Sequence, residues 1–483
     1  MKNNINILFA ASEAAPMAKE GGLGDVAGSL PRAFRKLGCK IAVIIPAYRK
    51  TLNYFKNPRA IAENLPINMD VRSLTADILE CRLAPGLPLY LVRKDEYFDR
   101  SGLYGNERGE YFDNTERFIF FSKSVAKFCT MMETPPDILF CNDWQTGLVM
   151  PMMIENNMDS TTRIFAIHNM GYLGLVPREM IGGIGLPAKY YGMDGIEYYG
   201  NMSLLKAGIQ YSDVVTTVSP TYAREIQTPE YGSGLDGLMR SVSDKIYGIL
   251  NGVDYGIWNP AGDKLITENY SRKNIAGKRI CKQDLLEITR LDKGSVDRPL
   301  LGMISRLVDQ KGIDLFIRAA QRLFNLDLGV IILGRGEKRY HKRLIKLRDR
   351  HPEHFSLNLD FNDELAHKIL AGCDMLLVPS RYEPCGLTQM YGMKYGTIPI
   401  VRSTGGLRDT VIDPEEGSDI CTGFKFIEYN PNDMVRAIKR ALKAFNNKKQ
   451  WNAMMKAGMS MDFSWHRSAN EYINLFRKEN MIP

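Results

Sequence analysis

Short runs rich in Ile, Val and Leu recur along the chain and constrain its fold more than any other feature. Runs that are apolar on both faces, instead of alternating, are typical of parallel strands buried between two layers of helices. Amphipathic segments such as Ile313–Phe324 separate them, which completes the rhythm of βαβ units. We therefore predict an α/β fold built from two doubly wound, Rossmann-like domains. The runs are Ile5–Ala11, Ile41–Ile45, Leu89–Val92, Ile138–Cys141, Ile164–Ile167 and Val214–Val218 in the first half, and Leu300–Ile304, Val330–Leu333, Met375–Val378 and Ile398–Val401 in the second.

A cluster of turn residues at Asn251–Pro260 predicts the boundary between the two domains. We place the first domain at residues 1–252 and the second at residues 253–460. The segment Ala261–Arg298, which is charged and helical in pattern, is expected to lead into the second domain. Two such domains facing one another create a cleft at the carboxyl ends of their strands, where ligands of doubly wound folds bind.

The charge balance and the cysteines exclude several classes of protein. The chain carries 63 Lys and Arg against 55 Asp and Glu, a net charge of +8 over 483 residues. This mild excess fits an anionic small substrate better than a nucleic acid, which requires clustered charge. No apolar stretch is long enough to cross a membrane, and the N-terminus does not read as a signal peptide. The scattered cysteines predict neither a zinc site nor a disulfide framework and favour the cytoplasm.

A glycine-rich segment, Lys19–Ala27, follows the first predicted strand. Gly21 and Gly22 allow the backbone to approach an anion, and a helix that starts near Asp25 offers free N–H groups to phosphate. The segment also fits a dinucleotide fingerprint, but it lies too far from the strand, and the second strand does not end in an acid. A nicotinamide dehydrogenase is therefore disfavoured. A glycine turn that serves only helix–strand packing is the alternative, and Lys19 favours phosphate.

Two further candidates in the first half follow predicted strands. His168 comes directly after Ile164–Ile167 and is followed by Asn169, at a strand end where site residues collect. Asp143 follows Ile138–Cys141 and precedes Trp144, and a carboxylate beside an aromatic ring is a common sugar-binding pair. A histidine satisfied by local backbone and an aspartate that caps a helix are the structural alternatives. No histidine pair has metal-ligand spacing.

The second half repeats the pattern of strand, loop and helix with charged residues in the loops. Arg306 and Lys311 share one strand-to-helix loop, which suits a clamp for a diphosphate. Glu383 follows another strand, where a carboxylate can hold sugar hydroxyls while the amides of Cys385, Gly386, Leu387 and Thr388 bind phosphate. A third loop, Thr404–Asp409, is again rich in glycine. Solvated loop charges and packing turns are the alternatives for each loop taken alone.

Together these motifs resemble the bacterial and plastid glycogen and starch synthases, retaining glycosyltransferases of the GT-B architecture, over essentially the whole chain. The resemblance implies that residues 461–483 form a helix that crosses back onto the first domain. The segments that carry it are Lys19–Val26, Glu110–Asn114, Pro136–Trp144, His168–Asn169, Lys206–Gly208, Thr216–Ile226, Asn251–Asp254, Ser305–Gly312, Pro379–Gln389, Tyr395–Thr397, Thr404–Leu407 and Phe463–Trp465.

The resemblance implies transfer of glucose from ADP-glucose to the non-reducing 4-hydroxyl of an α-1,4-glucan such as glycogen. Configuration is retained, no metal or other cofactor is needed, and neither a nucleic acid nor a membrane is a partner. UDP-glucose is the alternative donor. Relatives usually read Thr where this chain has Glu20, and His-Asp-Trp where it has Asn142-Asp143-Trp144.

The resemblance also implies a role for each candidate residue. Lys19, with Gly21 and Gly22, would bind the donor, and Arg306 and Lys311 would neutralise the leaving diphosphate. Glu383 and His168 would hold the donor glucose, and Asp143 would lie near the acceptor. The remaining substrate-binding positions are Asn169, Asn251, Phe361, which would stack on the base, and Cys385–Thr388.

Two other readings stay open beside an active synthase. A catalytically degenerate protein that binds glucan or nucleotide is motivated by Glu20 and Asn142, although all five catalytic candidates are present. An inverting or phosphorolytic relative is the weaker reading, since a phosphorylase-type enzyme needs a pyridoxal lysine and a longer chain. Because the catalytic candidates come from both halves, we expect closure of the two domains about Asn251–Pro260 to complete the site.

Overall fold

The computed structural model describes residues 5–56, 58–69, 72–107, 109–291, 296–360 and 362–481. The chain folds into two compact units. Unit 1 comprises residues 1–218, 223–252 and 465–483, and unit 2 comprises residues 219–222 and 253–464. Among the described residues, no helix is both long and apolar enough to cross a bilayer.

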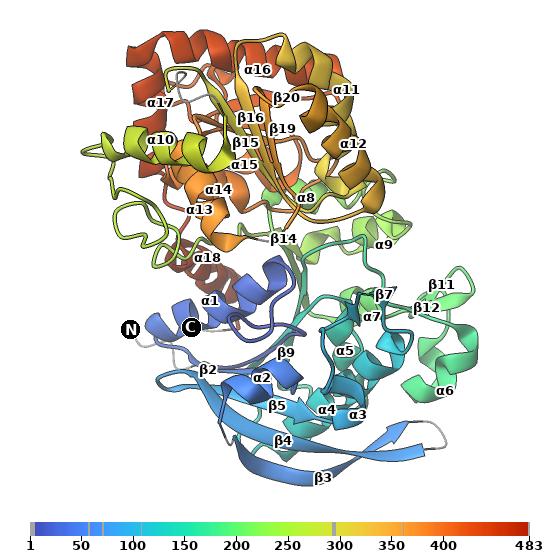
Figure 1. The fold of residues 1–483 in the computed structure, drawn as a ribbon. Helices are drawn as coiled ribbons and strands as arrows, with labels where there is room; N and C mark the ends of the chain where they lie inside the picture. The colour runs from blue at the N-terminus through green and yellow to red at the C-terminus, as the bar shows by residue number, and fades with distance from the viewer. Residues whose placement is uncertain are drawn as a thin grey trace. The chain divides into compact units, whose positions relative to one another are not determined.

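Unit 1 is built on a nine-stranded sheet in the order β14-β13-β9-β8-β1-β2-β5-β4-β3 (Figure 1). The strands from β14 to β5 are parallel, and β4 and β3 add an antiparallel hairpin at one edge. The strands are β1 (Asn6–Ala10), β2 (Lys40–Pro46), β3 (Arg59–Met69), β4 (Arg72–Ala84), β5 (Leu87–Arg93), β8 (Ile138–Asn142), β9 (Thr162–Ile167), β13 (Val214–Thr217) and β14 (Ile246–Gly248). Small strand pairs lie outside this sheet: β6 (Gly105–Asn106) with β7 (Gly109–Glu110), and β12 (Asn201–Ser203) with β10 (Leu175–Val176) and β11 (Glu197–Tyr198).

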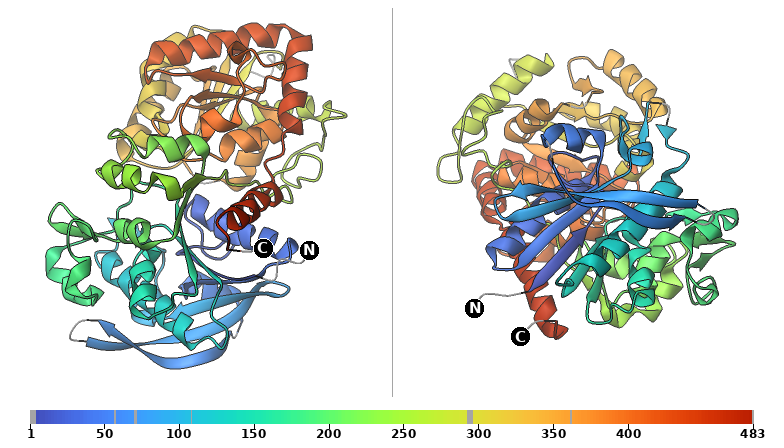
Figure 2. Two further views of the ribbon diagram at one scale, coloured as in Figure 1. Left: turned by 180° about the vertical axis from the view of Figure 1, so that it is seen from behind. Right: turned by 90° about the horizontal axis from the view of Figure 1, so that it is seen from below.

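Strand order reverses at β1, so right-handed crossovers place helices on both faces of this sheet. The helix α1 (Gly22–Lys36) pairs with the last helix, α18 (Trp465–Lys478), through ring contacts of Phe34 with Tyr472 and Phe476 (Figure 2). The other helices are α2 (Arg49–Tyr54), α3 (Asp95–Phe98), α4 (Asn114–Met131), α5 (Val149–Glu155), α6 (Ile181–Ile184), α7 (Leu204–Tyr211), α9 (Asp236–Ser241) and α8 (Pro220–Glu225), which spans the junction of the two units.

Unit 2 is a parallel six-stranded sheet in the order β17-β16-β15-β18-β19-β20. Its strands are β15 (Leu300–Ile304), β16 (Gly329–Leu333), β17 (Phe355–Asn358), β18 (Met375–Val378), β19 (Ile398–Arg402) and β20 (Phe424–Phe426). Its helices are α10 (Gly277–Thr289), α11 (Ile313–Phe324), α12 (Lys338–Arg350), α13 (Asp363–Gly372), α14 (Thr388–Lys394), α15 (Gly405–Thr410), α16 (Pro431–Asn446) and α17 (Lys448–Ser460).

Two apolar layers bury the sheet of unit 2 on both faces. The larger core lies under α11 and α16 and includes Phe316, Val330 and Ile438. A second cluster on the side of α10 and α13 includes Leu285, Ile331 and Ile369. Burial on both faces explains the wholly apolar strands, and the predicted class of two doubly wound α/β domains is confirmed.

Two sequence-based expectations about local structure need correction. Within the described part of 261–298, the helix is α10 (Gly277–Thr289), because turns stabilised by Asn259, Asp263 and Asn274 occupy the residues before it. The helix expected to start near Asp25 begins at Gly22, directly after the exposed glycine turn.

Candidate active site

The predicted site residues lie at the carboxyl ends of parallel strands, one group in each unit. In unit 1 they follow β1, β8, β9 and β14, and in unit 2 they follow β15 and β18. This edge collects loops in a doubly wound fold, because each strand must turn there before the next helix. The unit 1 group is Lys19, Gly21, Gly22, Asp143, His168, Asn169 and Asn251, and the unit 2 group is Arg306, Lys311, Glu383 and Cys385–Thr388.

A buried carboxylate, Glu13, shapes the glycine-rich loop after β1. Its Oε2 accepts hydrogen bonds from the amide N–H groups of Glu20 (2.8 Å) and Gly21 (3.1 Å). The hydroxyl of Tyr104 donates to its Oε1 at 2.7 Å and lies 2.7 Å from Ser12 Oγ. Burial is the main influence on the Glu13 carboxyl and raises its pKa. Glu13 therefore positions the loop, and the sequence-based interpretation overlooked it.

Lys19 is held at the mouth of this loop by an exchangeable partner. Its Nζ lies 2.7 Å from Asp25 Oδ1, and its side chain is 45% exposed. A Cβ added at Gly21 or Gly22 would meet no atom within 4 Å, so the backbone is open on that side. Exposed ion pairs contribute about 0–1 kcal/mol, so an incoming anion can displace Asp25 at little cost.

The imidazole of His168 is fixed by Asn142, the residue that departs from the usual family pattern. Asn142 Nδ2 donates to the carbonyl of Ala10 at 2.9 Å, which turns its Oδ1 toward His168 Nε2, also at 2.9 Å. Since Oδ1 only accepts, this arrangement assigns the proton of the neutral ring to Nε2. Burial lowers the pKa of His168 to about 4, so the ring is neutral at pH 7.

Asp143 braces the turn after β9 from the end of β8. Its Oδ1 accepts the amide N–H of His168 at 2.7 Å and that of Asn169 at 3.4 Å. Its backbone has a φ of 55°, a region that non-glycine residues rarely occupy and that is common at functional sites. Burial is the main cause that raises the pKa of Asp143 to about 7. The carboxyl therefore changes charge near neutral pH.

The two asparagines of the unit 1 group differ in their side-chain hydrogen bonds. Asn169 closes a local turn, because its Oδ1 accepts the amide N–H of Gly171 at 3.0 Å. Asn251 lies after β14 at the end of the unit, and its side chain makes no hydrogen bond to any residue that the structure describes. Its amide group is available to a ligand.

A partly buried ion pair links the two charged loops of unit 2. Lys311 Nζ lies 2.6 Å from Glu383 Oε2, with side chains 18% and 9% exposed. Ser380 Oγ donates to the same oxygen at 2.8 Å. The backbones are also joined, since the amide of Arg381 donates to the carbonyl of Gln310 at 2.8 Å. The structure thus brings together two catalytic candidates that are 72 residues apart.

Arg306 differs from its neighbour Lys311 in having no side-chain partner among the residues that the structure describes. It lies in the loop after β15 and is exposed. Its guanidinium makes neither an ion pair nor a hydrogen bond within the described ranges of the chain. An unpaired guanidinium beside a partly buried ion pair can bind an anion without first breaking a contact.

Close backbone contacts explain the glycines of the third loop. A Cβ at Gly405 would lie 2.0 Å from the carbonyl oxygen of Glu383, and one at Gly406 would lie 2.1 Å from that of Cys385. The Gly405 φ of 44° also favours glycine. Ser219 Oγ donates to the carbonyl of Pro384 at 2.6 Å. This loop supports the Glu383 loop, so its glycines have a packing explanation.

The remaining described candidates in unit 2 lie around the start of α14. Cys385 and Gly386 form the turn before α14, Thr388 is its first residue, and Gly386 has a φ of 70°. Phe361, expected to stack on the base, lies outside the described residues. Tyr391 stacks on Trp258 with ring centroids 4.2 Å apart. No group of three or more metal-ligating side chains is present in the described part of the chain.

Family models and curated relatives match most of the chain. Residues 6–241 match the model of the starch synthase catalytic domain, and residues 289–457 match glycosyl transferases group 1. Glycogen synthase of Desulfatibacillum aliphaticivorans is 44% identical over 98% of this chain and 99% of its own. Glycogen synthase of Koribacter versatilis is 40% identical over 99% of each chain.

Solved structures resemble the chain in the same way. The catalytic domain of starch synthase IV from Arabidopsis thaliana, bound to ADP and acarbose, has a TM-score of 0.88 and 31% identity over 99% of both chains. Sucrose-phosphate synthase from Thermosynechococcus elongatus has a TM-score of 0.60 and 16% identity over 98% of this chain and 99% of its own, a likeness of fold alone.

Proposed function

Since the chain belongs to the glycogen and starch synthase family of GT-B glycosyltransferases, we propose that its donor is ADP-glucose and that it retains the anomeric configuration. The chain is a glucosyltransferase that extends a glucan. The proposed acceptor is the non-reducing 4-hydroxyl of an α-1,4-glucan. The contact of Lys311 with Glu383, which joins the cation proposed for the diphosphate to the carboxylate proposed for glucose, supports a nucleotide-sugar donor.

Three cations would receive the diphosphate of the donor. Lys19 would exchange Asp25 for a phosphate oxygen, and Arg306 would bind through its unpaired guanidinium. One N–H of the Lys311 ammonium would stay hydrogen-bonded to Glu383, and its remaining N–H groups would face the leaving diphosphate. As the bond from C1 to the diphosphate oxygen breaks, negative charge grows on the nucleotide, and fixed cations stabilise it without reorganising. ADP bound to starch synthase IV from Arabidopsis supports adenine as the base.

The sugar would be held between groups that are already oriented. Glu383 would accept hydrogen bonds from glucose hydroxyls with the oxygen that Lys311 and Ser380 leave free. His168 would contact the same sugar, with its backbone carbonyl near the anomeric carbon. The ring is neutral at pH 7 and so adds no positive charge beside the developing oxocarbenium. The acceptor oxygen would then form the new bond to C1 on the face that the diphosphate leaves, and its proton would pass to the departing diphosphate oxygen.

A catalytically degenerate protein is the alternative, and the positions of Asn142 and Glu20 disfavour it. Asn142, one of the two departures from the family pattern, fixes the His168 ring and disturbs nothing assigned to chemistry. Glu20, the other, contributes its backbone N–H to Glu13 and exposes its side chain. Neither residue occupies the place of a catalytic candidate.

Glucose incorporation into glycogen, measured without added metal and with ADP-glucose and UDP-glucose in parallel, tests the proposal. We expect turnover with ADP-glucose to exceed that with UDP-glucose, and the anomeric signals of the product to be those of an α-linkage. Preference for UDP-glucose would overturn the donor assignment. A folded protein that binds glucan and turns over neither donor would establish the degenerate reading.

The ionisation of Asp143 gives a pH-dependence. If its carboxylate accepts a hydrogen bond from the acceptor hydroxyl, kcat/KM for glucan rises as Asp143 loses its proton near pH 7. About a tenth of the carboxyl is ionised one pH unit below its pKa, so we expect a gain of about tenfold between pH 6 and pH 8. His168, with a pKa of about 4, does not titrate in this window.

The matched variant is Asp143→Asn, which keeps the shape of the side chain and cannot ionise. Its kcat/KM for glucan should be lower than that of the wild type and flat between pH 6 and pH 8. A pH profile that is unchanged in Asp143→Asn would show that another group is responsible.

A further inference from the structure

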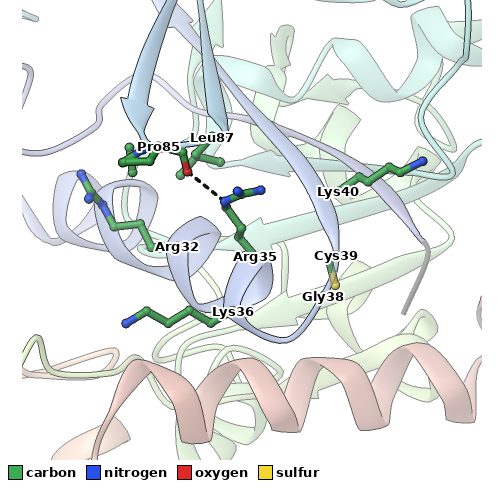
Figure 3. Close-up of a pocket in the computed structure, with 9 residues that line it drawn as sticks. Arg32, Arg35, Lys36, Gly38, Cys39, Lys40, Pro85 and Leu87 are labelled. Atoms are coloured by element: carbon green, nitrogen blue, oxygen red, sulfur yellow. Dashed lines mark hydrogen bonds between the residues drawn. The ribbon is translucent and has the colours of Figure 1, made fainter. Parts of the chain in front are cut away.

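A cavity of about 740 Å³ opens on unit 1 at the carboxyl-terminal end of α1 (Figure 3). The last turns of α1, the start of β2 and the hairpin turn between β4 and β5 form its walls. Four cationic side chains line it: Arg32, Arg35, Lys36 and Lys40. No acidic side chain is among the lining residues. The volume lies within the range of about 300–1,000 Å³ that small-molecule sites occupy.

Backbone carbonyls hold the two guanidinium groups in place. Arg32 Nε donates to the carbonyl of Gly28 at 2.7 Å, and its Nη2 donates to that of Leu83 at 2.8 Å. Arg35 Nε donates to the carbonyl of Pro85 at 3.0 Å. Because these contacts fix the planes of the guanidinium groups and leave N–H groups unused, a ligand would meet oriented donors at little entropic cost.

The hairpin turn is shaped around Arg35. A Cβ added at Gly86 would lie 2.1 Å from Arg35 Nη2, and the Gly86 φ of 66° also favours glycine. The turn therefore lies directly against the guanidinium. Arg35 is part of the built wall of the cavity, although its side chain is exposed to solvent at the cavity mouth.

The positive charge of the cavity is not balanced by ion pairs within the described ranges. None of the four cations forms an ion pair with a residue in the described part of the chain. The α1 C-terminus contributes a partial charge of about −0.5, which offsets a fraction of this charge. It accounts for Arg35 and Lys36 in the last turn, but not for Lys40 on β2 or Arg32 one turn earlier. An anion would relieve the remaining repulsion.

The cations are spread around the cavity. In Figure 3, Arg35 stands between Arg32 and Lys36 on one side and Lys40 on the other. Because these side chains extend to different sides of Arg35, a molecule with anionic groups at both ends meets more of them than a single phosphate does. We propose that this cavity binds a small molecule that carries two phosphate groups. The proposal concerns a site outside the candidate active site and does not rest on the proposed function.

Binding to the full-length protein by calorimetry, with the donor site saturated by ADP, tests this proposal. The probes are fructose 1,6-bisphosphate, fructose 6-phosphate and inorganic pyrophosphate. We expect the bisphosphate to bind one site and to bind more tightly than the monophosphate by about tenfold, since each charge-assisted contact contributes about one decade. Pyrophosphate binding as tight as that of the bisphosphate would identify the ligand as an inorganic one, and weaker binding would identify it as a phosphorylated metabolite.

The variant R35Q/K36Q/K40Q removes three positive charges from the cavity, and K342Q/R343Q/K346Q removes three from the exposed face of α12 in unit 2. We expect the first variant to lose at least about tenfold in bisphosphate affinity and the second to match the wild type. Wild-type glucosyl transfer in the first variant confirms that it folds. No binding to the wild type at millimolar concentration, or an equal loss in both variants, would overturn the proposal.

Discussion

We expect the Glu383→Gln variant to lose about a hundredfold to a thousandfold in kcat for glucosyl transfer. The substitution keeps the size of the side chain but removes the charge that holds Lys311 Nζ at 2.6 Å. A glutamine at this position accepts weaker hydrogen bonds from glucose hydroxyls and no longer orients the lysine toward the diphosphate. Initial rates at saturating donor and glucan measure the loss.

Measurements of unfolding by denaturant separate the loss of kcat in Glu383→Gln from a general disturbance of the fold. Removal of one partner from a buried pair leaves the other charge uncompensated and costs up to about 3–5 kcal/mol. We therefore expect Glu383→Gln to unfold at lower denaturant concentration than the wild type. The double variant K311M/E383Q has no orphaned charge and should recover part of that stability, while its activity falls further. Compared with Glu383→Gln, the double variant should therefore be more stable but less active.

The Lys282–Asp374 pair is the matched control. Lys282 Nζ lies 2.6 Å from Asp374 Oδ2, and the two side chains are 7% and 14% exposed. Asp374 Oδ2 also accepts the amide N–H of Leu300, the first residue of β15, whereas Lys311 follows the other end of that strand. Asp374→Asn should lower stability as Glu383→Gln does but leave kcat within about twofold of the wild type. Near-normal turnover in Glu383→Gln, or an equal loss of turnover in Asp374→Asn, would remove Glu383 from the catalytic set.

The sequence predicted those strands that are buried on both faces. Runs such as Val330–Leu333 and Met375–Val378 are apolar at every position, and they form the centre of the sheet in unit 2. The hairpin of β3 and β4 was not predicted, because its edge position leaves alternate residues exposed and its sequence mixes charged with apolar residues. A search for continuous apolar runs cannot find such strands.

The sequence also predicted that the candidate site loops follow buried strands, but not how their side chains pair. Lys311 and Glu383 were assigned to separate roles, because a contact across 72 residues depends on the adjacency of β15 and β18. Asn142 departs from the family pattern, and only the structure shows that its side chain bonds to His168. Glu13 was overlooked, although an acid directly after a buried strand was a usable signal.

The Arg306→Ala variant should lose at least about a hundredfold in kcat with no change in stability. An exposed guanidinium with no partner in the described residues contributes little to folding, so a large kinetic effect can come only from its contact with substrate. Arg306→Lys should recover part of the rate, since a lysine supplies the charge but not the fork of donors. Product inhibition by ADP should weaken in parallel, because the same contact holds the free nucleotide. Arg343→Ala, which removes an exposed arginine from α12, should leave both kcat and ADP inhibition unchanged. If Arg306→Ala retained wild-type kcat, the diphosphate would have to be neutralised by Lys19 and Lys311 without it.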